Sequence, residues 1–214
     1  MGKKAQFQRK DRLYEQAKED GFRSRASYKL IELDQRYHLL QPGAKVLDLG
    51  CWPGGWLEVA SDRVGTHGCV VGIDLVELSD LGKDNVKLIA GDAAEDRCIS
   101  AARQIAGSAF DLILSDMSPK LTGIKEVDRA GSLGCAELAL WVAHQLLRQK
   151  GNFVTKVFKS NEAEQFVKGL RQYFDRVERR ELESTRRSSN EYYVVGLGIK
   201  NATPAAKQLA HGGL

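Results

Sequence analysis

The chain has 214 residues, of which 43% are hydrophobic and 28% charged, and this predicts one folded domain with a short appendage. Its net charge is only +4. No apolar run approaches the roughly 20 residues that span a bilayer, so we expect no membrane span. The basic N-terminus leads into no apolar segment, so we expect no secretory signal and a cytoplasmic protein. The four cysteines form no CxxC pair and accompany no histidine cluster, which predicts free thiols and no metal site.

The positive charge is concentrated at the N-terminus. Residues 1–29 contain nine Lys and Arg side chains against four Asp and Glu, whereas the other 185 residues contain 23 basic and 24 acidic ones. Such a basic segment on a nearly neutral body indicates contact with a polyanion. A solvated, disordered tail would carry the same charges, so charge alone leaves both interpretations open.

Helical and strand-like patterns alternate along the chain. A short charged helix is expected over residues 10–20, and a second over 24–40, capped by Ser24 and ended by Pro42 and Gly43. Strands are expected over residues 44–50, 69–75, 86–92, 110–116, 151–158, about 174–183 and 192–199. Helices are expected between them over residues 55–63, 95–106, 130–149 and 161–172.

This alternation predicts an α/β fold, with a mostly parallel seven-stranded sheet and helices on both of its faces. Because no clear helix separates the last two strands, we expect the last strand to be antiparallel. The expected organisation is a basic N-terminal arm over residues 1–24, one domain over 25–200 and a disordered tail over 201–214.

A glycine-rich turn follows the first strand, in the segment DLGCWPGGW. Glycines at such a turn let a nucleotide-like ligand approach the backbone. Three other residues separate Gly50 from Gly54 and Gly55, so the GxGxxG cradle for a pyrophosphate is missing and a dinucleotide-binding fold is disfavoured. The acid at the start of the segment, Asp48, fits better beside a cationic amino-acid end.

Two further acids follow the next two strands. Asp74 ends the second strand and could accept both hydroxyls of a ribose, as an acid does in nucleotide-binding α/β folds. Asp92 follows the third strand and could accept from an adenine amino group. One acid after a strand is usually a cap or a turn residue. Three acids at one sheet edge, together with the glycine turn, favour a nucleoside-containing cofactor.

Four polar residues stand out in otherwise apolar surroundings. Asp116 follows the fourth strand, and Lys156 interrupts the apolar strand FVTKVF. Lys29 lies on the apolar side of the second helix, and Glu191 begins the last strand. A lysine within a strand is costly to bury unless it is paired. Each of these residues alone could instead be an ordinary surface position, with the lysines reaching solvent at element ends.

Taken in chain order, these segments resemble the FtsJ family of ribose 2′-O-methyltransferases over about residues 10–200. The matching segments are FRSRASYKL (22–30), VLDLGCWPGGW (46–56), the acid after the third strand (91–96), LILSDMSP (112–119), AELAL (136–140), GNFVTKVF (151–158) and SSNEYY (188–193). The resemblance implies a Rossmann-like fold of the class I methyltransferases that depend on S-adenosyl-L-methionine. The family's Lys-Asp-Lys-Glu tetrad falls on Lys29, Asp116, Lys156 and Glu191.

The resemblance also implies which residues bind the cofactor S-adenosyl-L-methionine. They are Asp48, Gly50, Gly54, Gly55, Trp56, Asp74, Asp92 and Asp116. The turn departs from the family at one position, because a small residue usually precedes Pro-Gly-Gly and here it is Trp52. The ring of Trp52 could narrow the cofactor pocket or point outward.

The reaction that the resemblance implies is methylation of a uridine 2′-hydroxyl in the A-loop of large-subunit ribosomal RNA, within the assembled subunit, by a monomer. Lys156 would act as general base or orient the hydroxyl together with Asp116, while Lys29 and Glu191 position the ribose. Close relatives modify transfer RNA, which is one alternative. A non-catalytic RNA-binding ribosome-assembly factor is another. A small-molecule methyltransferase is disfavoured because it gives the basic arm no role.

Overall fold

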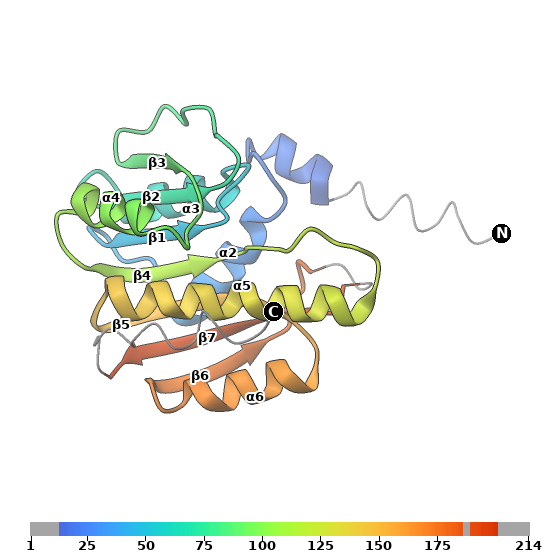
Figure 1. The fold of residues 1–214 in the computed structure, drawn as a ribbon. Helices are drawn as coiled ribbons and strands as arrows, with labels where there is room; N and C mark the ends of the chain where they lie inside the picture. The colour runs from blue at the N-terminus through green and yellow to red at the C-terminus, as the bar shows by residue number, and fades with distance from the viewer. Residues whose placement is uncertain (1–12, 186–188, 201–214) are drawn as a thin grey trace.

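The computed structural model describes residues 13–185 and 189–200 (Figure 1). Its middle layer is one seven-stranded sheet in the order β3-β2-β1-β4-β5-β7-β6. The strands are β1 (Lys45–Leu49), β2 (Cys69–Asp74), β3 (Val86–Ala90), β4 (Phe110–Ser115), β5 (Leu147–Phe158), β6 (Phe174–Arg180) and β7 (Glu191–Ile199). The helices are α2 (Ser27–Tyr37), α3 (Gly55–Val64), α4 (Asp96–Ala106), α5 (Lys125–Leu146) and α6 (Asn161–Leu170).

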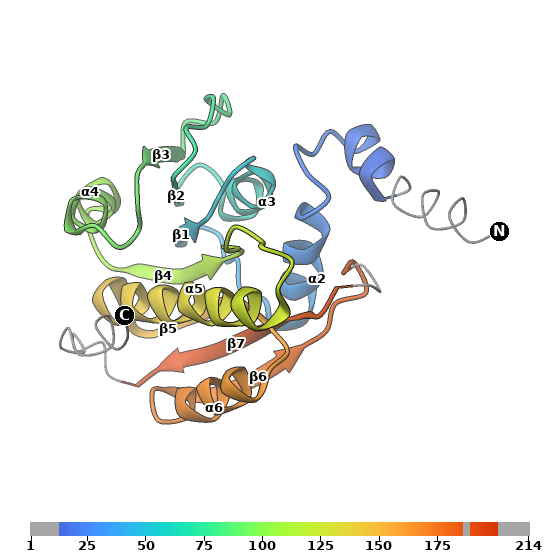
Figure 2. The same cartoon turned by 45° about the vertical axis from the view of Figure 1, so that its right-hand side comes forward.

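Helices cover both faces of the sheet (Figure 2). On one face, buried side chains of α2 and α3 join a hydrophobic cluster with residues of β1, β4 and β7. On the other, α4, α5 and α6 form a second cluster against the sheet. Ala136, Ala139 and Ala143 of α5 are fully buried, and their small side chains let this long helix lie close to the strands. The expected three-layer α/β architecture is therefore confirmed.

The last strand is antiparallel, as expected. β1, β2, β3, β4 and β5 form parallel pairs. β7 pairs antiparallel with both β5 and β6, so it lies between them in the sheet. This insertion brings the beginning of β7 to the edge where the parallel strands end, because Glu191 stands opposite Phe158 in the β5–β7 register.

Two helices differ from the sequence prediction by three or more residues at each end. The helix expected over 24–40 is α2, which stops at Tyr37 because His38 adopts a left-handed conformation with φ 51°. The Asp34 carboxylate then accepts from the backbone N–H of Leu40 at 2.8 Å, which directs the following residues away from the helix axis. At its start, Ser24 caps the preceding turn through the N–H of Ala26 rather than the helix itself.

The second difference concerns the longest helix. α5 begins at Lys125, five residues before the expected start, and ends at Leu146. Asp128 in its first turn accepts from the N–H groups of Thr122 and Gly123, which ties the preceding loop to the helix. β5 follows directly and begins four residues earlier than expected.

The second half of the N-terminal arm packs on the domain. Residues 13–19 are helical, and Ala17 is buried. Arg23 donates from its backbone to Glu58 of α3, and its guanidinium donates to the carbonyls of Ser79 and Asp80 after β2. The first half of the arm and the tail expected over 201–214 lie outside the described residues.

The four cysteines are free thiols. Within residues 13–185 and 189–200, no helix is both long and apolar enough to cross a membrane. The same ranges contain no cluster of three or more His, Cys, Asp or Glu side chains placed to hold a metal ion.

One buried histidine lies in the last turn of α5. His144 is 4% exposed, and among the described residues neither of its ring nitrogens has a hydrogen-bond partner. Its ring packs edge-on against Tyr173, with the ring centroids 4.5 Å apart. Burial lowers the pKa of His144, because the charged imidazolium would lose its hydration.

Stability should therefore fall in mild acid. Below the ordinary histidine pKa of about 6.5, the unfolded chain takes up a proton at His144 that the folded chain resists, and each further pH unit costs up to about 1.4 kcal/mol. We expect His144→Leu to remove part of the loss in unfolding free energy between pH 7 and pH 5, as measured by urea denaturation. Identical pH dependence in the two proteins would contradict this.

Candidate active site

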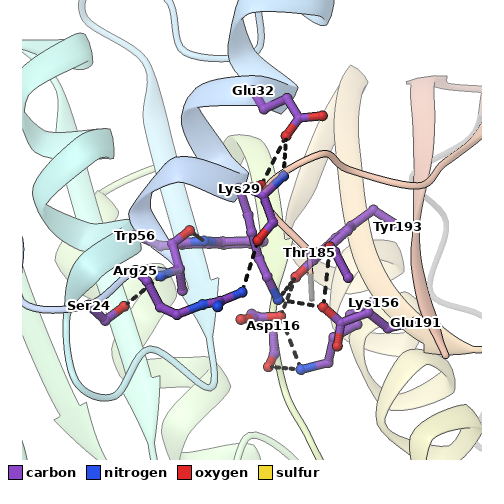
Figure 3. Close-up of polar contacts among 12 residues, drawn as sticks. Ser24, Arg25, Lys29, Glu32, Trp56, Asp116, Lys156, Thr185, Glu191 and Tyr193 are labelled. Carbon is purple, nitrogen blue, oxygen red and sulfur yellow. Dashed lines mark hydrogen bonds and ion pairs between the residues drawn. The ribbon is translucent and has the colours of Figure 1, made fainter. Parts of the chain in front are cut away.

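Four distant parts of the chain bring the tetrad together (Figure 3). Lys29 comes from α2, and Asp116 follows β4 directly. Lys156 lies in β5, and Glu191 is the first residue of β7. These elements meet at the edge of the sheet where the parallel strands end, so the structure assembles all four residues that the sequence singled out.

Two ion pairs hold these side chains. Lys29 Nζ lies 2.6 Å from Glu191 Oε1. Lys156 Nζ lies 3.0 Å from Asp116 Oδ1 and donates to the main-chain carbonyl of Asp116 at 2.8 Å. Both lysines are only 7% exposed, so their charges depend on these partners.

A tyrosine connects the two pairs. The Tyr193 hydroxyl accepts from Lys29 Nζ at 3.0 Å and donates to Asp116 Oδ1 at 2.6 Å. Sequence reasoning missed Tyr193, because an aromatic residue in an apolar strand is usually a core residue. Two signals could have found it: it stands two residues after Glu191, on the same face of the strand, and opposite Lys156 in the β5–β7 register.

The charges around Asp116 set its protonation state. Burial alone would raise the pKa of Asp116, but the ammonium groups of Lys156 and Lys29 and the hydrogen bond from Tyr193 outweigh burial and lower it. Burial, with the nearby charges of Asp116 and Glu191, raises the pKa of Tyr193 well above its ordinary value. At neutral pH the site thus has an ionised carboxylate and a protonated phenol.

The glycine turn lies at the same edge. Gly50 and Gly54 adopt φ values of 74° and 110°, which other residues rarely adopt. A Cβ on Gly50 would also lie 2.7 Å from the Met117 side chain, next to Asp116. Glycine is therefore needed for both the conformation of the turn and its close approach to the segment after β4.

Gly55 and Trp56 begin α3 and pack toward the N-terminal segment. A Cβ on Gly55 would meet the hydroxyls of Ser24 and Ser27 at 2.6 and 2.7 Å. The Trp56 ring is 3% exposed, donates from Nε1 to the Ala26 carbonyl and lies 5.8 Å from the Tyr193 ring, centroid to centroid. These contacts are structural, and a cofactor contact for either residue remains a prediction.

The residue that departs from the family pattern points into solvent. Trp52 is 58% exposed, so its ring does not fill the interior of the site. Its backbone N–H donates to Asp74 Oδ2 at 2.8 Å, and the N–H of Val76 donates to Oδ1 at the same distance. Two backbone donors thus fix the Asp74 carboxylate, which keeps lone pairs for further donors.

Asp48 is the most unusual acid at this edge. It is 1% exposed, and neither carboxylate oxygen has a hydrogen-bond partner in the part of the chain that the structure describes. Burial, and then the charges of Asp116 and Asp74, raise its pKa well above the ordinary value. A buried carboxyl without a partner is costly to ionise, and a cationic ligand group beside it would stabilise its charged form.

The third acid, Asp92, lies just beyond β3. Its Oδ1 accepts from the N–H of Ala94 at 2.8 Å. Asp48, Asp74 and Asp92 thus lie at or next to the carboxyl ends of three neighbouring strands, at the edge where open α/β sheets bind ligands. Together with the orphaned Asp48 carboxyl, these residues fit a donor that combines a nucleoside with a cationic end.

The sheet order, its antiparallel last strand and the acids at its carboxyl edge define a Rossmann-like methyltransferase. The chain belongs to the FtsJ-like methyltransferase family, whose model matches residues 22–199.

Similar proteins come from archaea, bacteria and a protist. A Methanothermobacter thermautotrophicus protein is 38% identical over 201 residues, which cover 94% of this chain and 95% of that one. A Cellvibrio japonicus protein is 41% identical over 190 residues, covering 88% and 89%. Both are named ribosomal RNA large subunit methyltransferase E. The crystal structure of a Plasmodium falciparum ribosomal RNA methyltransferase superimposes with a TM-score of 0.74 at 27% identity, covering 84% of this chain and all of that one.

Binding of a cationic donor should release a proton from Asp48, since a nearby positive charge favours the carboxylate. We expect calorimetric titration with S-adenosyl-L-methionine, in buffers of different ionisation enthalpy, to detect this release. Asp48→Asn should abolish the release and weaken binding at least ~10-fold, or about 1.4 kcal/mol. Equal affinity and equal proton release in the two proteins would exclude a contact between Asp48 and the donor.

Removal of the bridging hydroxyl should slow the reaction without weakening donor binding. In Tyr193→Phe, Lys29 and Asp116 lose their shared partner, and we expect kcat for methyl transfer to fall ~10-fold, which corresponds to about 1.4 kcal/mol. The matched control is Tyr192→Phe, because the Tyr192 hydroxyl has no hydrogen-bond partner among the described residues. Equal rates in the two variants would exclude a role for the bridge.

Proposed function

We propose that this chain transfers a methyl group from S-adenosyl-L-methionine to a ribose 2′-hydroxyl of large-subunit ribosomal RNA. The observation that carries the proposal is the paired tetrad, with its two buried lysines, beside an Asp48 carboxyl that has no hydrogen-bond partner among the described residues. The names of the relatives support the RNA substrate. The finer proposal is a uridine of the A-loop in the assembled subunit, which rests on family resemblance.

The chemistry requires alignment and removal of a proton. The donor supplies an electrophilic methyl group on a sulfonium sulfur. The protein must hold the 2′-oxygen in line with that group, and alignment of this kind is worth at most about 7–11 kcal/mol. Asp48 and Asp74 would hold the donor, while the tetrad would hold the ribose.

Lys156 is the proposed general base. In its neutral form, Nζ would accept the 2′-hydroxyl proton as the oxygen–methyl bond forms and the sulfur–methyl bond breaks. The bonding electrons would stay on the sulfur as a neutral thioether, and Lys156 would become an ammonium group. That ammonium has two acceptors in place, the carboxylate and the main-chain carbonyl of Asp116. Because the pKa of Asp116 is lowered, its carboxylate stays charged and stabilises the product of this step.

Lys29, Glu191 and Tyr193 would position the ribose. The Lys29 ammonium is shared between the Glu191 carboxylate and the Tyr193 hydroxyl, so its direction is fixed. A rigid donor and acceptor pair next to Lys156 can orient neighbouring ribose oxygens. Precise placement of the reacting oxygen requires this kind of support.

Arg25 is a proposed phosphate contact, and its side chain lies beside the tetrad in Figure 3. Its guanidinium donates to the Ser184 carbonyl at 2.9 Å, which holds the cationic group on this side of the site. Arg176 and Arg179, which could also contact phosphate, pair with Glu178 and Glu164. Arg186 and Arg187 lie outside the described residues.

Two alternatives remain. Methylation of transfer RNA would use the same tetrad. A non-catalytic assembly factor would not need two buried lysines, each paired with a carboxylate, so the tetrad disfavours it. We further propose that the protein acts as a monomer in the cytoplasm, which gel filtration and fractionation would check.

Mass spectrometry of ribosomal and transfer RNA from a deletion strain would identify the target. We expect one 2′-O-methyl mark to disappear from large-subunit ribosomal RNA and to return when purified protein is incubated with the undermethylated subunits. Loss of a transfer RNA mark instead would favour the first alternative, and no loss would favour the second.

Lys156→Ala should lower kcat by about 10²–10⁴-fold, as expected for loss of a general base. Donor affinity should stay within a factor of a few, as measured by calorimetry. Lys168→Ala, which removes an exposed lysine of α6, is the matched control and should leave kcat unchanged. A Lys156→Ala protein that methylates RNA at the wild-type rate would refute the assignment.

A further inference from the structure

A glutamate of α2 holds the segment that precedes β7. The Glu32 carboxylate accepts from the backbone N–H of Glu183 at 2.9 Å, and from the backbone N–H and hydroxyl of Ser184 at 3.2 and 2.9 Å (Figure 3). These partners are more than 150 residues away in sequence. One carboxylate thus serves three donors of a loop that lies outside regular secondary structure.

The same loop leads to the tetrad. Thr185 follows Ser184, and its hydroxyl donates to Glu191 Oε1 at 3.5 Å. That oxygen also accepts from Lys29 Nζ at 2.6 Å. The loop 182–185 therefore supports one side of the Lys29–Glu191 ion pair, and Glu32 supports the loop.

Helical spacing explains how one element serves both purposes. Residues three or four positions apart lie on the same side of a helix. Glu32 is three residues after Lys29, so the residue that pairs with Glu191 and the residue that holds the loop share one side of α2. Arg25, just before the helix, donates to the Ser184 carbonyl from the other direction.

The loop depends on Glu32 for the hydrogen bonds of two backbone N–H groups, those of Glu183 and Ser184. Ser184 is 9% exposed, and Leu182 is 7% exposed and belongs to the core cluster under α2. Buried backbone groups that lose a partner are costly. A side chain that cannot accept hydrogen bonds at position 32 would therefore release the loop from α2.

We propose that Glu32 is a positioning residue for the ribose-binding half of the active site: it holds loop 182–185 against α2, so that Glu191 stays aligned with Lys29. This inference rests on the proposed function, because Glu191 and Lys29 are assigned to the ribose. Donor binding should not depend on Glu32, since Asp48 and Asp74 lie on β1 and β2 and contact no residue of this loop in the described structure.

Two substitutions at Glu32 test the proposal. Glu32→Leu removes all three acceptor contacts, and we expect kcat on the RNA substrate to fall ~10-fold while the Kd for S-adenosyl-L-methionine is unchanged. Glu32→Gln keeps one acceptor oxygen, so it should recover most of the rate. A fall in donor affinity equal to the fall in kcat would overturn the proposal, as would wild-type kcat in Glu32→Leu.

The control lies on the same helix. Asp34→Ala also removes a carboxylate that accepts a backbone N–H, that of Leu40, but on the far side from the tetrad loop. We expect it to lower the melting temperature and leave kcat unchanged. If Asp34→Ala slows methyl transfer as much as Glu32→Leu does, the effect is general destabilisation and the positioning role is refuted.

Hydrogen exchange separates this proposal from the proposed function. Amide exchange at residues 183–185 should be faster in Glu32→Leu than in the wild type, whatever the protein methylates. Unchanged exchange there overturns the positioning role even if RNA methylation is demonstrated. A wild-type protein that methylates no RNA would instead refute the proposed function, and faster exchange in the variant would still support the loop contact.

Discussion

The active site depends on two lysine side chains, Lys29 and Lys156, that are almost fully buried. Each requires a carboxylate within hydrogen-bonding distance, because an unpaired buried charge would cost several kcal/mol. Lys29 has Glu191 and Lys156 has Asp116, and Tyr193 joins the two pairs. The four elements that carry these groups are thus held together by charge as well as by the apolar core.

The antiparallel insertion of β7 makes this pairing possible. Parallel strands bring their ends to the carboxyl edge, so Asp116 reaches this edge directly after β4 and Lys156 late in β5. β7 runs in the opposite direction, and it therefore brings its beginning to the same edge. Glu191 and Tyr193 stand at its first and third positions, opposite Phe158 and Lys156. A parallel β7 would have placed them at the other end of the sheet.

The sequence predicted the fold because strand–helix alternation is a local pattern, and it pointed to the tetrad through the resemblance to the FtsJ family. Strand–helix alternation fixes the layers, and a lysine within an apolar strand signals a paired charge. Tyr193 and Glu32 escaped prediction for the opposite reason. In a sequence, a tyrosine within a strand is interpreted as a core residue and a glutamate on a helix as a surface residue. The hydrogen-bond partners that give these two residues their roles lie more than 150 residues away in the chain, Lys29 for Tyr193 and Glu183 for Glu32. The packing of Gly55 against Ser24 and Ser27 is equally invisible in the sequence.

Arg23 has a consequence for any truncation of the basic arm. It joins the start of α3, through Glu58, to the carbonyls of Ser79 and Asp80 in the segment after β2. A deletion that removes Arg23 along with the upstream lysines would loosen the chain around Asp74. A loss of activity could then come either from lost RNA contacts or from a damaged donor site, and the experiment would not distinguish them. Shortened proteins that retain residue 22 onward would keep the two effects apart.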